Sequence, residues 1–161
     1  MSLSEHIVTA PAGERDVLLV RLRHDTWPND LRYADDVADW TVTDEESNSV
    51  TFTATGADAD GEPTDDTGID SRGISVPDPD LILWRRFEVL SQAGDSTPVE
   101  VTVYRYLSSD LTEPAAYAIL SLTGPTRDGR VVSFEASNAN TVNRDAPSRR
   151  YTYSNSPGLR R

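Results

Sequence analysis

The chain has 161 residues, of which 37% are hydrophobic, and it carries a formal net charge of −12. This acidity argues against nucleic acids and anionic membranes as direct partners, because phosphate groups bind to basic surfaces. Cysteine is absent, which excludes disulfides and thiol nucleophiles, and the lack of a long apolar run leads us to expect neither a membrane span nor a signal peptide.

The first predicted strand lies in the stretch DVLLVRLR, where apolar and polar positions alternate. Leu18, Val20 and Leu22 share one face of it, and Arg21 and Arg23 share the other. The alternation therefore predicts a strand.

An acidic hairpin is predicted next. LRYADD is a short extended piece, SVTFTATG is a strand rich in β-branched residues, and the acidic turn DEESN precedes that strand. We expect Trp40 and Val42 to pack near Phe52. The acids of this region are Asp35, Asp36, Asp39, Asp44, Glu45 and Glu46. Because the whole chain is rich in acids, we interpret the region as a structural hairpin with a solvated tip, and predict no catalytic centre there.

The middle of the chain predicts a loop followed by a helix. Residues 57–73 are rich in Asp and Gly and read as an acidic surface loop. A helix is expected at about residues 81–93, because the apolar residues there fall near helical spacing and Gly94 supplies a stop. These apolar residues are Leu81, Trp84, Val89 and, less regularly spaced, Phe87.

Further strands are predicted in PVEVTVYRYLSSD and on both sides of the turn GPTRDGR. The expected fold is therefore mainly β, an antiparallel β-sandwich or partly open barrel with one α-helix between strands. We expect a β-sandwich domain over residues 15–145, an N-terminal arm over residues 1–14 and an extended C-terminal arm over residues 146–161.

A metal site has only a weak signal in the acidic loop. Its candidates are Asp58, Asp60, Glu62 and Asp65. Three of them alternate as in a calcium-binding loop, but Pro63 stands where such a loop needs Gly, and Ile69 stands where it needs a bidentate Glu. We therefore predict no specific metal site and no cofactor.

Enzyme signatures are also missing. The sequence has no Gly-x-Ser-x-Gly motif and no Lys for a phosphate-binding loop, and its only histidines are His6, near the N-terminus, and His24, which we expect at the surface. We predict that the chain is not an enzyme. Two alternatives stay open: a carbohydrate-binding accessory domain that uses surface aromatic residues, and a hydrolase with paired carboxylates.

Basic residues show an unusual bias, since all 15 are Arg and none is Lys. Together with the large acidic excess, this composition resembles that of proteins from salt-loving archaea and their viruses, in which salt screens self-repulsion. An ordinary acidic protein from a GC-rich bacterium or phage is the alternative. If the halophilic interpretation holds, unfolding should become easier below about 0.5 M salt, because net charge is screened less.

A resemblance to a known family rests on the order of several motifs. LRYADDVADWTV, VTFTATG, ISVPDPD, a helix, VEVTVYRYLSSD and RRYTYSNSPGL follow one another along the chain. This order resembles a family of small tail proteins of tailed phages, known as a domain of unknown function (DUF1833). The likeness spans about residues 15–159, and VTVYRYLSSD and LRYADD contribute most to it.

The resemblance implies a structural virion protein of the tail tip or baseplate, similar to hub or distal-tail components. Such a subunit would form a homo-oligomeric ring that joins the tail tube to the receptor-binding tip. Its partners would be copies of itself, the tail tube, the tape measure and tip or receptor-binding proteins. It would be made in the host cytoplasm and lie at the distal end of the tail. The expected interface residues are Arg149, Arg150, Tyr151 and Tyr153, because Arg and Tyr are favoured at interface cores.

Overall fold

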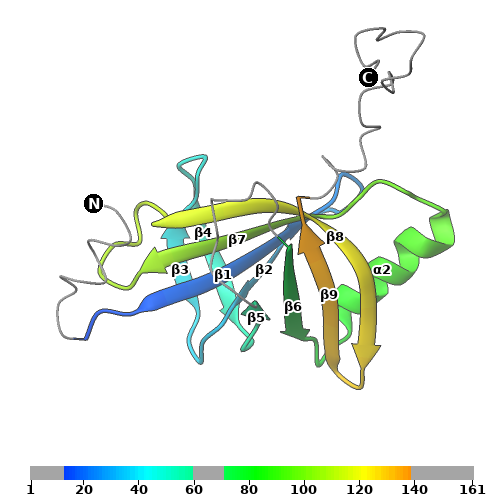
Figure 1. Ribbon diagram of the computed structural model, residues 1–161, viewed down its shortest axis with the longest axis horizontal. Coiled ribbons are helices and arrows are strands. Elements are labelled where there is room, and N and C mark those ends of the chain that lie inside the picture. Colours follow the sequence, from blue (N-terminus) through cyan, green and yellow to red (C-terminus); the bar gives the residue numbers. More distant parts are fainter. Residues whose placement is uncertain (1–12, 60–70, 139–161) are drawn as a thin grey trace, which may run out of the picture.

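The computed structural model describes residues 13–59 and 71–138 (Figure 1). These residues contain nine strands and one helix. In chain order they are β1 (Asp16–Arg23), β2 (Leu31–Ala34), β3 (Trp40–Thr43), β4 (Ser49–Ala54), β5 (Asp58–Ala59), β6 (Ser71–Pro77), α2 (Ile82–Ala93), β7 (Glu100–Leu107), β8 (Ala116–Asp128) and β9 (Val131–Ser137). The mainly β fold with a single short helix is confirmed. No helix in the described ranges is long and apolar enough to cross a membrane.

All strands belong to one bent sheet in the order β3-β4-β2-β1-β7-β8-β9-β6-β5. Every neighbouring pair is antiparallel except β2 and β4, which are parallel, with Tyr33 opposite Thr53. The sheet is consistent with the predicted β-sandwich or partly open barrel, and this one parallel pair makes it mixed instead of antiparallel throughout. The chain reverses direction twice between these strands, once between β2 and β3 and again in the hairpin β3–β4, so β4 runs in the same direction as β2.

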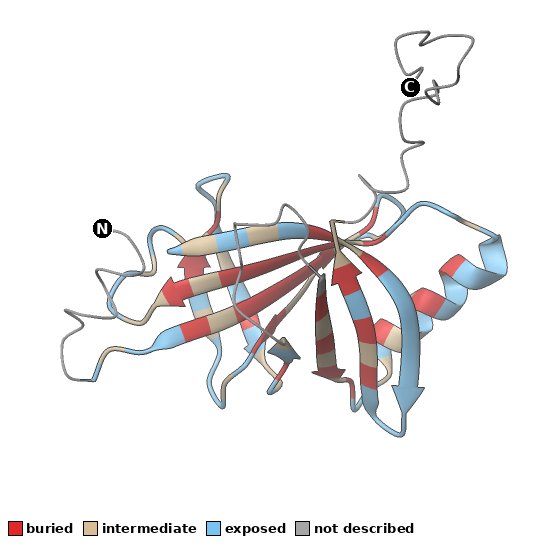
Figure 2. Ribbon diagram, viewed as in Figure 1, coloured by how far each residue is buried: buried red, intermediate tan, exposed pale blue. Residues whose placement is uncertain are grey.

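Two hydrophobic clusters lie on opposite faces of the central strands. Val20 and Leu22 of β1 join the larger cluster, which also contains side chains of β6, α2, β7, β8 and β9. Val17 and Leu19 point to the other face, where a smaller cluster forms beneath the hairpin β3–β4. Figure 2 shows β1 and β7 buried over most of their length.

Arg21 lies on the face of β1 that points away from Val20 and Leu22, as predicted, yet its side chain is buried. Arg21 is only 2% exposed, because the hairpin β3–β4 packs over the face on which it lies. The hairpin itself forms as predicted: Trp40 lies opposite Phe52, and Val42 joins Phe52 in the smaller cluster.

Helix α2 begins after Leu81, which has a φ of 56°, and ends at Gly94, which has a φ of 65° and donates its backbone N–H to Ser91 O. Its buried side chains are Leu83, Phe87 and Leu90. Of the residues predicted for the apolar face, Phe87 is buried, whereas Val89 is 63% exposed. Apolar residues occur on several faces of this helix, so spacing alone did not show which of them packs against the sheet.

The predicted loop over residues 57–73 is shorter than expected. Ala57 is buried in the larger cluster, and β5 pairs with β6, with Asp58 opposite Ser75 and Ala59 opposite Ile74. Both ends of this stretch therefore belong to the sheet, because backbone pairing and the burial of Ala57 offset its polar composition. Residues 60–70 lie outside the described residues.

Strand β8 bends in its middle, as Figure 1 shows. A register shift falls between Thr123 and Thr126, and Gly124 between them has a φ of 59°, a left-handed conformation that glycine adopts at little cost. The first half of β8 pairs with β7, and β9 pairs with it from Ser121 onward.

Candidate functional site

A network of hydrogen bonds fixes the tip of the hairpin β3–β4 to the central sheet. Arg21 of β1 donates to Glu45 Oε1 at 2.7 Å and to Thr102 Oγ1 at 3.3 Å. The Tyr104 hydroxyl of β7 donates to Glu45 Oε2 at 2.7 Å. Both oxygens of the Glu45 carboxylate are thus bonded, and the position of the tip relative to β7 is well defined.

The electrostatics of this network keep Glu45 ionised. Burial pushes the pKa of Glu45 upward, but the hydrogen bond from Tyr104 and the charge of Arg21 outweigh it, so the pKa lies below its ordinary value. Burial, and then the bond to Glu45, raise the pKa of Tyr104. The tyrosine is therefore a neutral donor to a charged carboxylate at neutral pH.

Asp44 also has a structural role at the hairpin tip. It is buried, and its Oδ1 accepts hydrogen bonds from the backbone N–H of Glu46 at 3.0 Å and of Asn48 at 2.8 Å. The prediction of a solvated tip is wrong for Asp44 and Glu45, because the turn folds back on these two acids. The interpretation of the region as a structural hairpin agrees with these bonds.

Asp36 forms hydrogen bonds at the base of the same hairpin. Its Oδ2 accepts from Trp40 Nε1 and from Arg15, both at 2.7 Å. The backbone N–H of Val37 and then the indole N–H of Trp40 lower the pKa of Asp36. These bonds fix the start of β3, and both carboxylate oxygens of Asp36 accept hydrogen bonds.

A cavity of about 430 Å³ lies between the hairpin tip and the loop that joins β7 to β8. It is lined by Asp44, Glu45, Ser47, residues 112–114 and Tyr117. The Tyr117 ring stacks at a tilt on Tyr104, with 6.1 Å between the ring centroids. Three carboxylates but no basic residue line the cavity, so it favours a cationic ligand group.

The first half of β8 adds an apolar strip next to this cavity. Tyr117 is 48% exposed and Ile119 is 51% exposed. Both side chains lie on the same face of β8, and Tyr117 is directly opposite Tyr104 of β7. Leu122 donates its N–H to Val99 O, so the alternation of an antiparallel pair turns the backbone groups of Tyr117 and Ile119 away from β7. Within residues 13–59 and 71–138, no strand pairs with that edge of β8 before Ser121.

Two other hollows offer less chemistry. One, of about 380 Å³, lies beside α2 and is mostly apolar, with Trp27 and Pro28 opposite Leu90. Arg86 covers the Trp27 ring at 5.1 Å. Nothing about this hollow defines a particular ligand.

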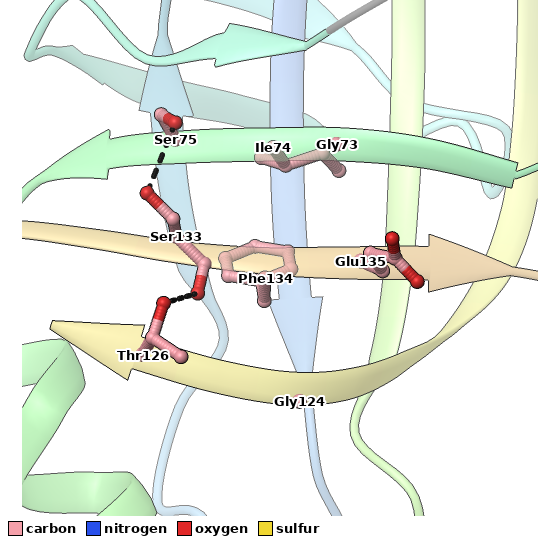
Figure 3. Close-up of a pocket in the computed structure, with 8 residues that line it drawn as sticks. All are labelled: Gly73, Ile74, Ser75, Gly124, Thr126, Ser133, Phe134 and Glu135. Atoms are coloured by element: carbon pink, nitrogen blue, oxygen red, sulfur yellow. Dashed lines mark hydrogen bonds between the residues drawn. The ribbon is translucent and has the colours of Figure 1, made fainter.

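The hollow of about 250 Å³ in Figure 3 lies over three neighbouring strands, β6, β9 and β8, next to the bend of β8. Ser75 and Ser133 share a hydroxyl hydrogen bond of 3.2 Å there, and Thr126 donates to Ser133 O at 3.3 Å. Glu135 is the charged residue of its lining. The small side chains and the bulge produce this hollow, and its hydroxyls already form hydrogen bonds within the lining.

Most of the residues predicted as sites lie outside the part of the chain that the structure describes. In the part of the chain that the structure describes, no group of three or more His, Cys, Asp or Glu could hold a metal ion. Asp58 is exposed on β5. Asp60, Glu62 and Asp65 lie outside the described residues, as do the interface candidates Arg149, Arg150, Tyr151 and Tyr153.

The prediction for His24 is wrong, because this residue is buried. Its Nδ1 lies 2.9 Å from Thr26 Oγ1 and its Nε2 lies 3.2 Å from Thr97 O. The turn after β1 and the segment before β7 cover it, and these contacts hold its ring in place.

The surface on β8 was missed by reasoning from the sequence. Tyr117 and Ile119 alternate with residues of the core, so the stretch AYAIL is apolar on both faces of its strand. That pattern was the available signal. It indicates a strand buried on both sides, and only the structure leaves one side exposed.

The described residues form a mainly β protein in which no described strand covers the edge of β8 before Ser121. Over residues 2–151 the chain matches the family model described as a domain of unknown function (DUF1833), and it belongs to that family. A comparison with curated proteins finds no match.

Proposed function

We propose that this chain is a structural subunit of the tail tip of a tailed virus and packs with copies of itself in a ring. The observation that carries the proposal is the first half of β8, where the exposed side chains of Tyr117 and Ile119 lie beside a strand edge that no described strand covers. Proteins usually blunt or cover such edges, since an open edge pairs with other chains.

A ring needs a heterologous interface, in which one surface of each subunit meets a different surface of the next. The open edge of β8 is one such surface, and the central sheet behind it is buried on both faces, which gives it a rigid support. The order of sequence motifs resembling phage tail proteins supports the location at the tail tip, and membership of the DUF1833 family is consistent with it.

In this role the chain joins the tail tube to the receptor-binding tip, as a distal-tail or hub component. Its neighbours are copies of itself, the tail tube, the tape measure and the tip proteins. The hydrogen bonds that engage Asp36, Asp44 and Glu45 favour a structural use of these acids over a catalytic one.

The proposal is tested by immunogold labelling of intact virus particles with antibody against this chain. Label confined to the distal end of the tail is expected. Particles that stay unlabelled, under conditions where a known tail protein is labelled, would overturn the proposal and make glycan binding the next function to test. Deletion of residues 146–161 is expected to leave the β domain folded and to stop assembly of the tail.

A further inference from the structure

We propose that the acidic cavity beside β8 receives the basic arm of a second copy of this chain, residues 146–161. Arg149 and Arg150 would bind carboxylates of the cavity, and the residues after them would pair with the open edge of β8. This inference rests on the proposed function, which requires copies to associate, and it names both surfaces of the contact.

Charge complementarity identifies the occupant. Residues 146–161 contain four Arg and no acid, a charge of +4, so the remaining residues carry −16. The lining of the cavity is acidic as well, so its charge is opposite to that of residues 146–161. Arg21 balances Glu45 at 2.7 Å, and backbone N–H groups satisfy Asp44, but Glu113 is exposed and forms no hydrogen bond or ion pair with any described residue. An incoming guanidinium would find its strongest partner at Glu113.

The shape of the cavity suits arginine in particular. Its volume of about 430 Å³ has room for a long side chain. A guanidinium can bind a carboxylate through two parallel hydrogen bonds and can also stack on an aromatic ring. Glu113 offers the carboxylate and the half-exposed ring of Tyr117 offers the aromatic face, and both line the same cavity.

The backbone of β8 provides a second contact for the same segment. The sequence after Arg150 is Tyr-Thr-Tyr, and these residue types favour strands. An extended peptide can add a strand to an open edge, where main-chain hydrogen bonds supply affinity and side-chain pockets supply specificity. Since Tyr117 lines the cavity and also belongs to the open edge, an arm bound in the cavity would continue along β8 past Ile119.

The arm is long enough to leave its own subunit. Residues 139–161 follow the described part of the chain, and at about 3.3 Å per residue they span up to roughly 75 Å when extended. A second copy is the occupant expected in a ring, because each subunit then gives its arm to one neighbour and accepts the arm of the other. Binding of the arm within its own chain is the competing outcome.

Disulfide trapping tests this inference on the full chain, which has no cysteine of its own. A chain carrying Ser47→Cys in the cavity lining and Ser148→Cys in the arm, which keeps both Glu113 and Arg149, is oxidised and run on a non-reducing gel. Dimers and longer ladders are expected, because the two positions meet between copies. The matched control carries Asp128→Cys and Ser148→Cys, with the first cysteine at the exposed far end of β8, and should give at least tenfold less cross-linked product.

A cross-linked monomer would show that the arm binds within its own chain and would overturn the inference. Cross-linking equal to that of the Asp128→Cys control would overturn it as well. Neither result touches the proposed function, because labelling of the tail tip does not depend on where the arm binds. Conversely, a cross-linked ladder from a protein that labelling does not find in virus particles would support the contact between copies and contradict the proposed function.

Discussion

The two faces of the central strands are stabilised in different ways. The cluster that includes α2 contains buried aliphatic and aromatic side chains such as Leu83, Phe87 and Phe134. The cluster beneath the hairpin β3–β4 is smaller, and a buried ion pair between Arg21 and Glu45 borders it. Burial of apolar side chains therefore fixes the helix to the sheet, whereas the hairpin depends in addition on charged hydrogen bonds.

The largest effect is expected in the cluster that includes α2. Leu83 is fully buried, so Leu83→Ala should lower the free energy of unfolding by about 2–5 kcal/mol through lost burial and a remaining cavity. Chemical denaturation would measure this. Val89→Ala on the exposed face of the same helix is the control, with an expected change below about 0.5 kcal/mol. Equal losses in both variants would contradict the placement of the helix.

Removal of Glu45 should destabilise the hairpin side. Glu45→Ala leaves Arg21 buried with only Glu100, at 3.8 Å, as a charged neighbour, and should cost about 2–4 kcal/mol. The control is Glu46→Ala at the next position, where the side chain is exposed and the expected cost is below about 1 kcal/mol. Denaturation curves of both variants would check this, and a Glu45→Ala variant as stable as Glu46→Ala would refute the network.

The same ion pair predicts a pH dependence on one side of the sheet. Because the pKa of Glu45 is lowered in the folded protein, its stabilising contribution is present above the ordinary glutamate pKa of about 4.3 and is lost as the pH falls toward the folded value. The stability difference between the natural chain and Glu45→Gln should therefore shrink below about pH 4.3. Thermal unfolding of both from pH 7 to pH 3 would measure it, and a constant difference would contradict the lowered pKa.

The smallest effect is expected at the surface of β8. Since about half of Tyr117 is exposed, Tyr117→Ser should change the free energy of unfolding by less than about 1 kcal/mol. Under the proposed function it should nevertheless reduce incorporation into virus particles, which quantitative blotting of purified particles would show. A large loss of stability would instead make this side chain part of the core.

Reasoning from the sequence succeeded where a local pattern was sufficient. The β-branched alternation of SVTFTA and the acidic turn before it were enough to predict the hairpin in which Trp40 lies opposite Phe52. The segment ending at Gly94 was recognised as the helix. The same reasoning did not show that Arg21 and His24 are buried, because polar side chains in a strand or a turn look the same whether or not a later segment covers them.

The mainly β class, the single helix and the hairpin were determined by the sequence itself, since periodicity and turn residues act over a few neighbouring positions. Only the tertiary structure decided that Glu45 reaches Arg21 across the sheet and that β2 runs parallel to β4. It also decided that Tyr117 and Ile119 stay exposed beside an acidic cavity. These features depend on contacts between residues distant in the chain, which local sequence patterns do not specify.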